Sequence, residues 1–406
     1  MNWSQVKLVE AAEINPGIPR DVTPEPSELV TFLPMAAIGE DGSLETSETR
    51  PYKTVSKGYT VFCRGDVLLA KITPCMENGK AALVNGICTK VVCGSTEFHV
   101  LRARNGIDPR YLFHLIWNKP FRRLAARNMT GSAGQKRVPK SFLETHSIPL
   151  PHKNGKPDLE EQKRIAAILD KADAIRRKRQ QALRLTDDFL RSVFLDMFGD
   201  PEARGWEMTT AEGVAADDRG SIRTGPFGSQ LLHSEFVDDG IAVLGIDNAV
   251  TNQFAWGKPR FVTEEKYEEL KRYTVHPGDV LITIMGTCGR CAVVPDDIPR
   301  AINTKHLCCI TLDQNQCLPE FLHSYFLIHP IARRYLTLHS KGAIMDGLNM
   351  GIIKNLPVPE APLSLQRDFA RIIKQRCGLA ARLTSQQDEA EDLFSSLQQR
   401  AFRGEL

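Results

Sequence analysis

The sequence predicts an α+β fold in which one architectural plan occurs twice along 406 residues. Gly65-Asp66-Val67-Leu68-Leu69 returns 213 residues later as Gly278-Asp279-Val280-Leu281-Ile282. The segment from Pro109 to Pro120 returns 210 residues later, from Pro319 to Pro330. Solenoid repeats have periods of about 20–50 residues, so this much longer period excludes a solenoid. We therefore expect two similar α+β domains, each followed by a long helix.

The first predicted domain comprises residues 1–151. Short runs rich in β-branched residues, separated by turn residues, predict its strands. Apolar residues at helical spacing then predict a helix over Tyr111–Arg127, and a Gly-rich loop follows at Thr130–Gln135. The predicted strands are Val61–Ile72, Ala81–Val84, Lys90–Cys93 and Glu97–Leu101.

The second predicted domain, residues 203–359, repeats this order of elements. Its helix is predicted over Glu320–Leu338, and its loop over Ser340–Gly347. The predicted strands are Ile241–Leu244, Val280–Met285, Cys291–Val294 and His306–Leu312.

Two long helices are predicted at residues 158–199 and 363–403. Asp158 can cap the first helix, and Glu161 can complete a capping box. In both helices apolar residues recur in alternating steps of three and four, which is the pattern of a heptad seam. The seam includes Ile175, Arg179, Leu183, Phe189 and Leu190 in the first helix and Leu379, Leu383, Gln387, Leu393 and Phe394 in the second.

The two seams match at a constant offset of 204 residues, whereas the offset between the two domains drifts between 208 and 213. An insertion of one or two residues would rotate everything beyond it off the seam, so length is constrained in the helices and free in the domain loops. Two helices of equal length with one apolar stripe each are expected to pair with each other as a coiled coil within the chain. The alternative is that each helix docks separately on its own domain.

Charge points to a partner only locally. The net charge is +3, but residues 109–143 contain no Asp or Glu, and such a basic stretch is typical of a phosphate-contacting face. The alternative is an ordinary solvated helix and loop. The basic residues are Arg110, Lys119, Arg122, Arg123, Arg127, Lys136, Arg137 and Lys140.

No segment has the roughly 20 consecutive apolar residues of a membrane helix, and the N-terminus MNWSQVKLVE lacks an apolar signal core. We therefore expect a cytoplasmic protein without a membrane partner. In a reducing compartment its ten cysteines are expected to be thiols.

Motifs that would indicate catalysis or a bound cofactor are missing from the sequence. It has no phosphate-binding Gly-x-x-x-x-Gly-Lys loop, no Gly-x-Gly-x-x-Gly, no His-Glu-x-x-His, and no Asn-Pro-Pro-aromatic or Asp-Pro-Pro-aromatic segment that would hold a flipped adenine. Asp66 and Asp279 stand at strand entries, where turn capping is the expected role.

Cys288-Gly-Arg-Cys291 has the spacing of a zinc or thiol-exchange motif. The repeat argues against that chemistry, because Cys291 aligns with Ala81 and no second Cys-x-x-Cys completes a four-ligand site. We expect Cys291 to be a small buried strand residue and the chain to hold no metal.

Turns that lead from one strand to the next are the candidate base-contacting surfaces. Lys80 and Arg290 occupy the same place in the two copies of one turn, and Gln135 and Asn349 are residue types suited to adenine, as Arg137 is to guanine. An ordinary hairpin with surface cations is the alternative. The candidate DNA-binding residues are Lys71, Lys80, Arg122, Arg123, Ser132, Gln135, Lys136, Arg137, Ser229, Gln230, Arg290, Lys341 and Asn349.

With this order of parts, the whole chain resembles the specificity subunit of a type I restriction–modification system. Ile148-Pro-Leu-Pro151 and Leu356-Pro-Val-Pro359 resemble that family's entries into its helices, and Ser192 to Pro201 resembles the exit from the first one. Thr224-Gly-Pro-Phe-Gly-Ser229 resembles a phrase near the start of its recognition domains. Residues 1–60 have no Gly-Pro-Phe-Gly, which indicates two domains of different subtype.

The resemblance implies that each α+β domain is a target recognition domain for one half of a bipartite, asymmetric site in double-stranded DNA. It implies that the helices pair as an antiparallel coiled coil, space the domains and dock two methyltransferase subunits. Those subunits would bring S-adenosylmethionine and flip the adenine, and a restriction or translocase subunit would join the complex. The chain itself would be non-catalytic and bind no cofactor. Three alternatives are the same module in a methyltransferase complex without a nuclease, a coiled-coil scaffold with two non-DNA ligand-binding domains, and an enzyme that uses the cysteines.

Overall fold

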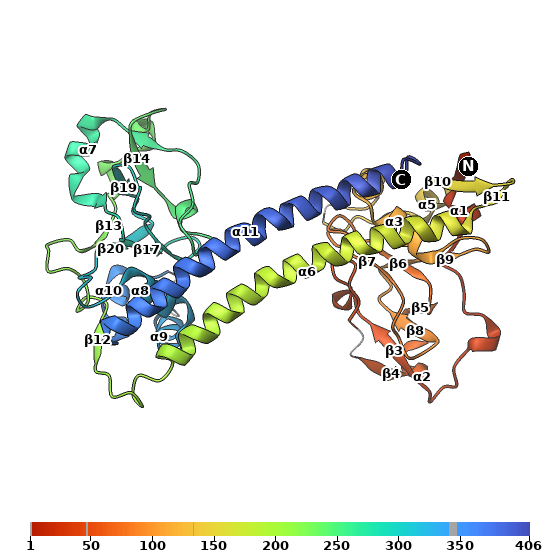
Figure 1. Ribbon diagram of the computed structural model, residues 1–406, viewed down its shortest axis with the longest axis horizontal. Helices are drawn as coiled ribbons and strands as arrows, with labels where there is room; N and C mark the ends of the chain where they lie inside the picture. Colours follow the sequence, from red (N-terminus) through yellow and green to blue (C-terminus); the bar gives the residue numbers. More distant parts are fainter. Residues whose placement is uncertain (1, 46–47, 133, 341–346) are drawn as a thin grey trace. The chain divides into compact units, whose positions relative to one another are not determined.

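The chain forms two compact units in the computed structural model, which describes residues 2–45, 48–132, 134–340 and 347–406 (Figure 1). The first unit comprises Met1–Gln181 together with Thr384–Leu406, and the second comprises Ala182–Leu383. Each unit therefore contains one α+β domain and one half of each long helix. Within the described ranges, no helix is both long and apolar enough to cross a membrane.

Two four-stranded sheets form the body of the first domain. One is antiparallel and has the order β2 (Ala12–Ile14), β9 (Phe98–Ala103), β6 (Val67–Ala70), β7 (Ala81–Leu83). The other has the order β4 (Thr49–Pro51), β3 (Leu29–Leu33), β8 (Val91–Gly94), β5 (Thr60–Cys63), with β3 and β8 parallel. A third sheet joins the start of the domain to its end, because β1 (Asn2–Lys7) pairs with β10 (Ser147–Lys153), which also pairs with β11 (Lys156–Pro157).

The helices of the first domain are short. Among them, α3 and α4 follow one another directly and contribute the largest buried side chains, including Tyr111, Ile116 and Phe121. The helices are α1 (Leu8–Ala11), α2 (Tyr52–Val55), α3 (Pro109–Trp117), α4 (Lys119–Arg127) and α5 (Lys140–Thr145), with 3₁₀ turns η1 (Arg20–Val22) and η2 (Met35–Ala37).

The second domain repeats the sheets of the first. An antiparallel sheet has the order β13 (Ile222–Thr224), β20 (Leu307–Ile310), β17 (Val280–Thr283), β18 (Cys291–Val293). A mixed sheet has the order β15 (Phe261–Val262), β14 (Ile241–Leu244), β19 (Ala301–Asn303), β16 (Thr274–Val275), again with one parallel pair, β14 and β19. The strand β12 (Met208–Thr210) pairs with β21 (Pro357–Pro359) as β1 pairs with β10.

The helices of the second domain complete the same plan. They are α7 (Glu264–Leu270), α8 (Pro319–Ile328), α9 (Pro330–Ser340) and α10 (Met350–Lys354), with 3₁₀ turns η3 (Gly228–Gln230), η4 (His233–Glu235), η5 (Ile246–Asn248) and η6 (Lys271–Tyr273). The equal strand orders confirm the prediction of two similar α+β domains.

Three predicted elements are each divided in two in the structure. The strand predicted over Val61–Ile72 is two strands in two sheets, because Gly65 at φ 90° turns the chain between β5 and β6. The helix predicted over Tyr111–Arg127 is broken at Asn118, whose side chain accepts a hydrogen bond from the Phe121 amide and starts α4. The second domain breaks in the same way, between α8 and α9 at Pro330.

The long helices α6 (Leu159–Phe198) and α11 (Leu363–Ala401) pair antiparallel in both units. In the first unit Arg176 forms an ion pair with Glu391 at 3.0 Å, and Arg179 donates to Gln386 at 2.8 Å. In the second unit Asp187 forms an ion pair with Arg376, and the rings of Phe194 and Phe369 lie 5.2 Å apart. Partner numbers fall along α11 as they rise along α6, which confirms the predicted antiparallel pairing.

Part of the predicted seam is not buried by this pairing. Ile175 and Phe189 of α6 are 48% and 58% exposed, and Leu379 and Leu393 of α11 are 50% and 53% exposed. Pairing of the two helices therefore leaves these predicted seam residues partly exposed. A pair of helices covers only a narrow strip of each partner, and the apolar stripe here is wider than that strip.

A glutamine at equivalent positions of α6 and α11 joins the start of each helix to its domain. Gln162 accepts a hydrogen bond from the Asp108 amide and donates to the Gly106 carbonyl, both at 3.0 Å. Gln366 accepts from the Leu318 amide at 2.8 Å and donates to the Gln316 and Ala361 carbonyls. Both glutamines are buried. Each tie holds the first turn of a long helix against the start of α3 or α8.

Candidate nucleic-acid interface

One loop of the first domain gathers several of the predicted site residues. The loop 130–137 is closed by two backbone hydrogen bonds between Thr130 and Arg137, at 2.8 and 2.9 Å. It is attached to the end of β6, because the Thr73 amide donates to the Lys136 carbonyl and the Val138 amide donates to the Lys71 carbonyl. The structure thus brings Lys71, Ser132, Gln135, Lys136 and Arg137 into one loop and the strand end beside it.

Within this loop the side chains differ in freedom. Ser132, Gln135 and Lys136 are exposed. Arg137 instead forms a forked pair with Glu97, from Nε at 2.9 Å and from Nη2 at 2.8 Å. The hydrogen bonds from Arg137 hold the pKa of the Glu97 carboxyl below its usual value. A guanine contact by Arg137 would therefore have to replace a pairing that already satisfies its guanidinium.

Two predicted cations, Lys80 at the end of the turn between β6 and β7 and Arg122 of α4, are engaged with backbone carbonyls at this turn. Arg122 donates from Nη1 to the Glu77 carbonyl at 3.1 Å, and burial lowers the pKa of its guanidinium. Lys80 donates from Nζ to the Met35 carbonyl at 3.2 Å. Trp117 adds a third tie, from Nε1 to the Gly79 carbonyl at 2.9 Å. Arg122 and Lys80 thus stabilise the turn.

The basic stretch is less free than its sequence predicts, because acids at its two ends and from other segments pair with its cations. Arg110 pairs with Asp108 and Asp170, Arg137 with Glu97, and Lys140 with Glu144. Since Arg122 is occupied in the turn, the exposed cations of this stretch without an ion pair to any described residue are Lys119, Arg123, Arg127 and Lys136. Arg123 and Lys136 are the predicted phosphate contacts that keep this freedom.

The second domain presents a different set of groups. Arg290 is exposed directly before β18, at the place that Lys80 has before β7. Ser229 is exposed in η3, while Gln230 accepts hydrogen bonds from the Phe227 amide and the Tyr273 hydroxyl. The Asn349 side chain caps α10 by accepting from the Ile352 amide at 2.9 Å, so its carbonyl end is already used. Lys341 lies outside the described residues, as does most of its loop.

The Gly-Pro-Phe-Gly phrase has a structural reason at its first glycine. A Cβ atom on Gly225 would lie 2.0 Å from the Asn303 carbonyl oxygen and 2.3 Å from the Thr304 carbonyl carbon. Only glycine allows the chain to pass so close to the end of β19. The close approach fixes the path into η3, where Phe227 is half exposed.

Asp66 and Asp279 are turn-capping residues, as predicted. Asp66 accepts from the Cys63 amide at 2.7 Å, and Asp279 accepts from the His276 amide at 2.9 Å. The sequence did not reveal their buried ion pairs, in which Arg102 binds Asp66 and Arg223 binds Asp279. The repeated Gly-Asp pair marks the two aspartates in the sequence. Their arginine partners cannot be matched by the repeat, because Arg102 follows Asp66 in the chain whereas Arg223 precedes Asp279.

All ten cysteines lie within the described residues, and five of them, including Cys291, are buried. Cys291 is fully buried at the first residue of β18, where the first domain has the equally buried Ala81. Burial raises the pKa of the Cys291 and Cys308 thiols. No group of three or more His, Cys, Asp or Glu side chains among the described residues could hold a metal ion.

The family model for the type I restriction modification DNA specificity domain matches residues 2–185 and 238–389 of the chain. The chain belongs to this family. The match covers the first α+β domain, the second domain from residue 238 onward and most of both helices, which agrees with the doubled architecture.

Curated relatives carry the same description. The Escherichia coli type I restriction enzyme EcoAI specificity subunit is 44% identical over 166 residues, 40% of this chain and 26% of the relative. The EcoEI specificity subunit of the same organism is 42% identical over 152 residues, 37% of this chain and 25% of the relative. These alignments span about a quarter of each relative. The E. coli EcoBI specificity subunit is 26% identical over 332 residues, 74% of this chain and 66% of the relative.

Solved structures share the fold. A chain from a study of the assembly and conformational transition of the type I R-M system aligns with a TM-score of 0.57 at 22% identity, over 100% of this chain and 98% of that one. The type I restriction-modification system S subunit from M. genitalium aligns with a TM-score of 0.55 at 14% identity, over 99% and 96%.

Proposed function

We propose that the chain is the non-catalytic DNA-recognition subunit of a type I restriction–modification complex. Each α+β domain contacts one half of a bipartite, asymmetric sequence in double-stranded DNA. The observation that carries the proposal is that the four-stranded sheets of the two domains have the same strand order while their turns expose different side chains. Lys80, for example, donates to the Met35 carbonyl, whereas Arg290 at the equivalent place is exposed. Two domains of one fold with different surface groups suit a target made of two different halves.

The helices supply the docking surface for protein partners in this proposal. Ile175 and Leu379 are equivalent across the 204-residue repeat, as are Phe189 and Leu393, and all four are half exposed. Each unit thus carries one member of each repeated exposed pair, one on α6 and one on α11, and the second unit also exposes Leu185 on α6. Apolar side chains exposed at repeated positions indicate a surface that is covered twice by the same kind of partner, which we take to be two methyltransferase subunits.

Chemistry belongs to those partners. The methyltransferase subunits bring S-adenosylmethionine, and a restriction or translocase subunit joins through the complex. The proposal needs no metal or cofactor in this chain. It is favoured over a scaffold with non-DNA ligands by the family of the chain and by the free cations Arg123 and Lys136.

Domain exchange tests the proposal. Residues 8–146 of the first domain, between the β1–β10 pair, are replaced by those of a family member with a different target. The complex with methyltransferase subunits is then expected to methylate a sequence changed in one half only, as measured by methylation-sensitive sequencing of host DNA. A change in both halves would contradict separate recognition by the two domains, and unchanged methylation would contradict recognition by this chain.

A further inference from the structure

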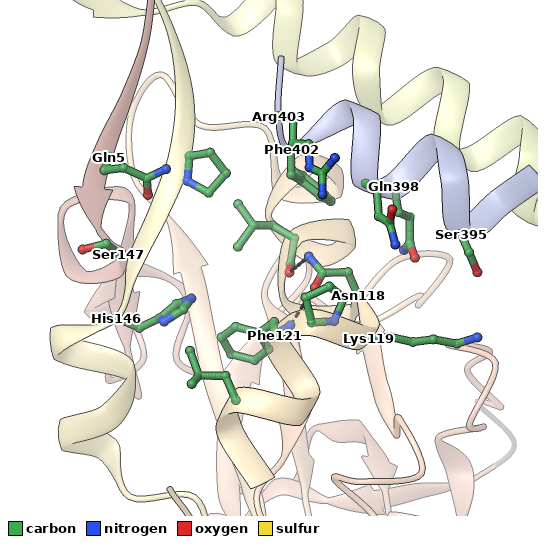
Figure 2. Close-up of a pocket in the computed structure, with 15 residues that line it drawn as sticks. Gln5, Asn118, Lys119, Phe121, His146, Ser147, Ser395, Gln398, Phe402 and Arg403 are labelled. Carbon is green, nitrogen blue, oxygen red and sulfur yellow. Dashed lines mark hydrogen bonds between the residues drawn. The ribbon is translucent and has the colours of Figure 1, made fainter. Parts of the chain in front are cut away.

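A cavity of about 440 Å³ opens in the first unit where α11, the α3–α4 junction and the β1–β10 sheet meet. Its apolar walls come from Leu115, Pro120, Phe121, Leu124 and Phe402. Figure 2 shows Ser395, Gln398, Phe402 and Arg403 of the C-terminal segment facing Gln5, His146 and Ser147 across it. The volume falls within the roughly 300–1,000 Å³ typical of binding pockets.

The second unit fills the equivalent place with two rings. Phe194 and His329 are both fully buried, with ring centroids 6.3 Å apart, and the His329 Nε2 lies 3.1 Å from the Phe198 carbonyl oxygen. Phe194 also lies against Phe369, at 5.2 Å. The repeat offsets of 204 and 210 residues place Gln398 and Lys119 of the first unit where the second has Phe194 and His329.

An aromatic contact that both units share supports this correspondence. The rings of Tyr111 and Phe402 lie 5.6 Å apart in the first unit, and those of their equivalents Phe321 and Phe198 lie 4.8 Å apart in the second. The frame around the cavity is therefore the same in both units. The cavity is open in the first unit because Gln398 and Lys119 stand where Phe194 and His329 fill the second unit.

Gln398 leaves a hydrogen-bonding group without a partner beside the cavity. Its side chain is 93% buried, since 7% is exposed, and its Nε2 atom has no hydrogen-bond partner among the described residues. A buried polar group without a partner is unfavourable, so a hydrogen-bond acceptor supplied from the cavity would be favoured. The terminal torsion of a glutamine is soft, so the amide can turn toward an oxygen atom placed in the cavity.

The rim of the cavity carries positive charge and no negative charge. Lys119 and Arg403 are exposed at its edge, and no Asp or Glu lines it. Burial lowers the pKa of His146, so this third basic residue is held toward its neutral form. The surroundings therefore fit an apolar group that is followed by a carbonyl or carboxylate oxygen and flanked by acidic residues.

We propose that this cavity is a docking pocket for a segment of one methyltransferase subunit, which places a large apolar side chain between Leu115 and Phe402. An oxygen of the segment accepts a hydrogen bond from Gln398, and acidic side chains of the segment face Lys119 and Arg403. The proposal rests on the proposed function and adds to it that the two partner copies bind unequally. The copy at the first unit gains an anchor that Phe194 and His329 deny to the other.

The test fills the cavity as the second unit does, with Lys119→His and Gln398→Phe in one chain. Purified chain and the methyltransferase subunit of the same system are mixed, and native mass spectrometry and titration calorimetry report the number of bound copies and their affinities. Wild-type chain is expected to bind two copies, one at least tenfold more tightly. The filled variant is expected to lose that tenfold advantage, while Ser396→Ala, an exposed change on α11 away from the cavity, keeps it.

A charge variant keeps the test independent of packing. Lys119→Glu with Arg403→Glu changes two exposed side chains and is expected to weaken the tighter copy in the same way. Two tight copies on the filled variant, with raised thermal stability, would overturn the proposal and make the cavity a packing defect. Reduced DNA affinity with both copies retained would also overturn it. Failure of wild-type chain to bind any methyltransferase subunit would instead refute the proposed function.

Discussion

The two α+β domains hold their sheets alike and present their turns differently. The strand orders of the two four-stranded sheets match, and the same ties recur: a Gly-Asp turn whose aspartate pairs with an arginine, and a glutamine that fixes the helix start. The turn that leads into β7 holds Lys80 and Arg122 inward, whereas the shorter turn that leads into β18 leaves Arg290 exposed. Repeated residues thus hold the backbone, and unrepeated residues face outward.

The buried ion pairs should show the largest difference between the two domains. Asp279 accepts from Arg223, Thr311, Cys309 and the His276 amide, whereas Asp66 accepts from Arg102 and the Cys63 amide. Changing Asp279 to Ala leaves Arg223 buried and unpaired, for which we expect a loss of about 3–5 kcal/mol in unfolding free energy. Asp66→Ala should cost less, because Arg102 is more exposed than Arg223.

Urea unfolding followed by fluorescence measures both losses. The exposed Asp239→Ala serves as control and should leave the midpoint unchanged. Equal and small losses for Asp66→Ala and Asp279→Ala would show that the two turns do not depend on their carboxylates.

The helix ties come next in size. Gln366→Ala removes three hydrogen bonds and Gln162→Ala removes two, and both leave buried backbone groups without partners. We expect losses of about 1–3 kcal/mol each, with Gln366→Ala at the higher end. Hydrogen exchange should locate the loosening at the first turns of α11 and α6 respectively. The exposed Gln181→Ala should change neither measurement, and a loss of the same size there would contradict the assignment.

The sequence alone predicts the repeated parts well, because two copies of one pattern check each other. The Gly-Asp turns, the buried place of Cys291 and the gapless helices all follow from comparing the halves. The break at Asn118 was missed because its amide acts as a cap through a side-chain geometry that periodicity does not reveal. The sequence shows the apolar stripe of α6 and α11, but not that Ile175 and Phe189 remain exposed.

The candidate site was harder to predict, because the partners of each cation come from distant segments. Glu97 stands 40 residues before Arg137 and neutralises it, and the Glu77 carbonyl holds Arg122 from 45 residues away. A basic run in the sequence shows how many cations there are, but not which of them are already paired with other groups of the protein. Gln398 gave no signal, since its role depends on the absence of the rings that close the other unit.

Acid should destabilise the open junction of the first unit through His146, as it should the closed junction of the second through His329, because burial lowers the pKa of both side chains. His146 lies on the cavity wall against Phe121, with ring centroids 5.1 Å apart, and burial lowers its pKa. Below about pH 6.5 the unfolded chain takes up a proton that the folded chain resists, so stability is full above that pH and falls as pH decreases. Glu97, Asp170 and Asp247, whose pKa values are also lowered, act only in a more acidic range.

Changing His146 to Phe should therefore flatten the fall in unfolding free energy between pH 7.5 and 5.5. Because the ring is only partly buried, the effect should be small. The exposed His233→Asn in the second unit is the control and should leave the slope as it is. If wild type and His146→Phe lost unfolding free energy equally between pH 7.5 and 5.5, His146 would not contribute to the acid sensitivity in this range.

The smallest expected effect separates the free cations of the first domain from the held ones. Arg123 and Lys136 are exposed without ion pairs to described residues, while Arg122 is occupied by the Glu77 carbonyl. If the free cations contact phosphates, each loss should lower the slope of log affinity against log salt by about 0.9 for duplex DNA. Arg123→Ala with Lys136→Ala should thus lower it by about two units.

Arg122→Ala should weaken binding through a loosened turn without changing the slope, because its charge does not displace a counterion from the DNA. Fluorescence anisotropy on a duplex with the methylated motif, between 50 and 200 mM salt, measures both quantities. An unchanged slope for the double variant would leave Arg123 and Lys136 as a solvated surface and move the recognition surface of the first domain to another face.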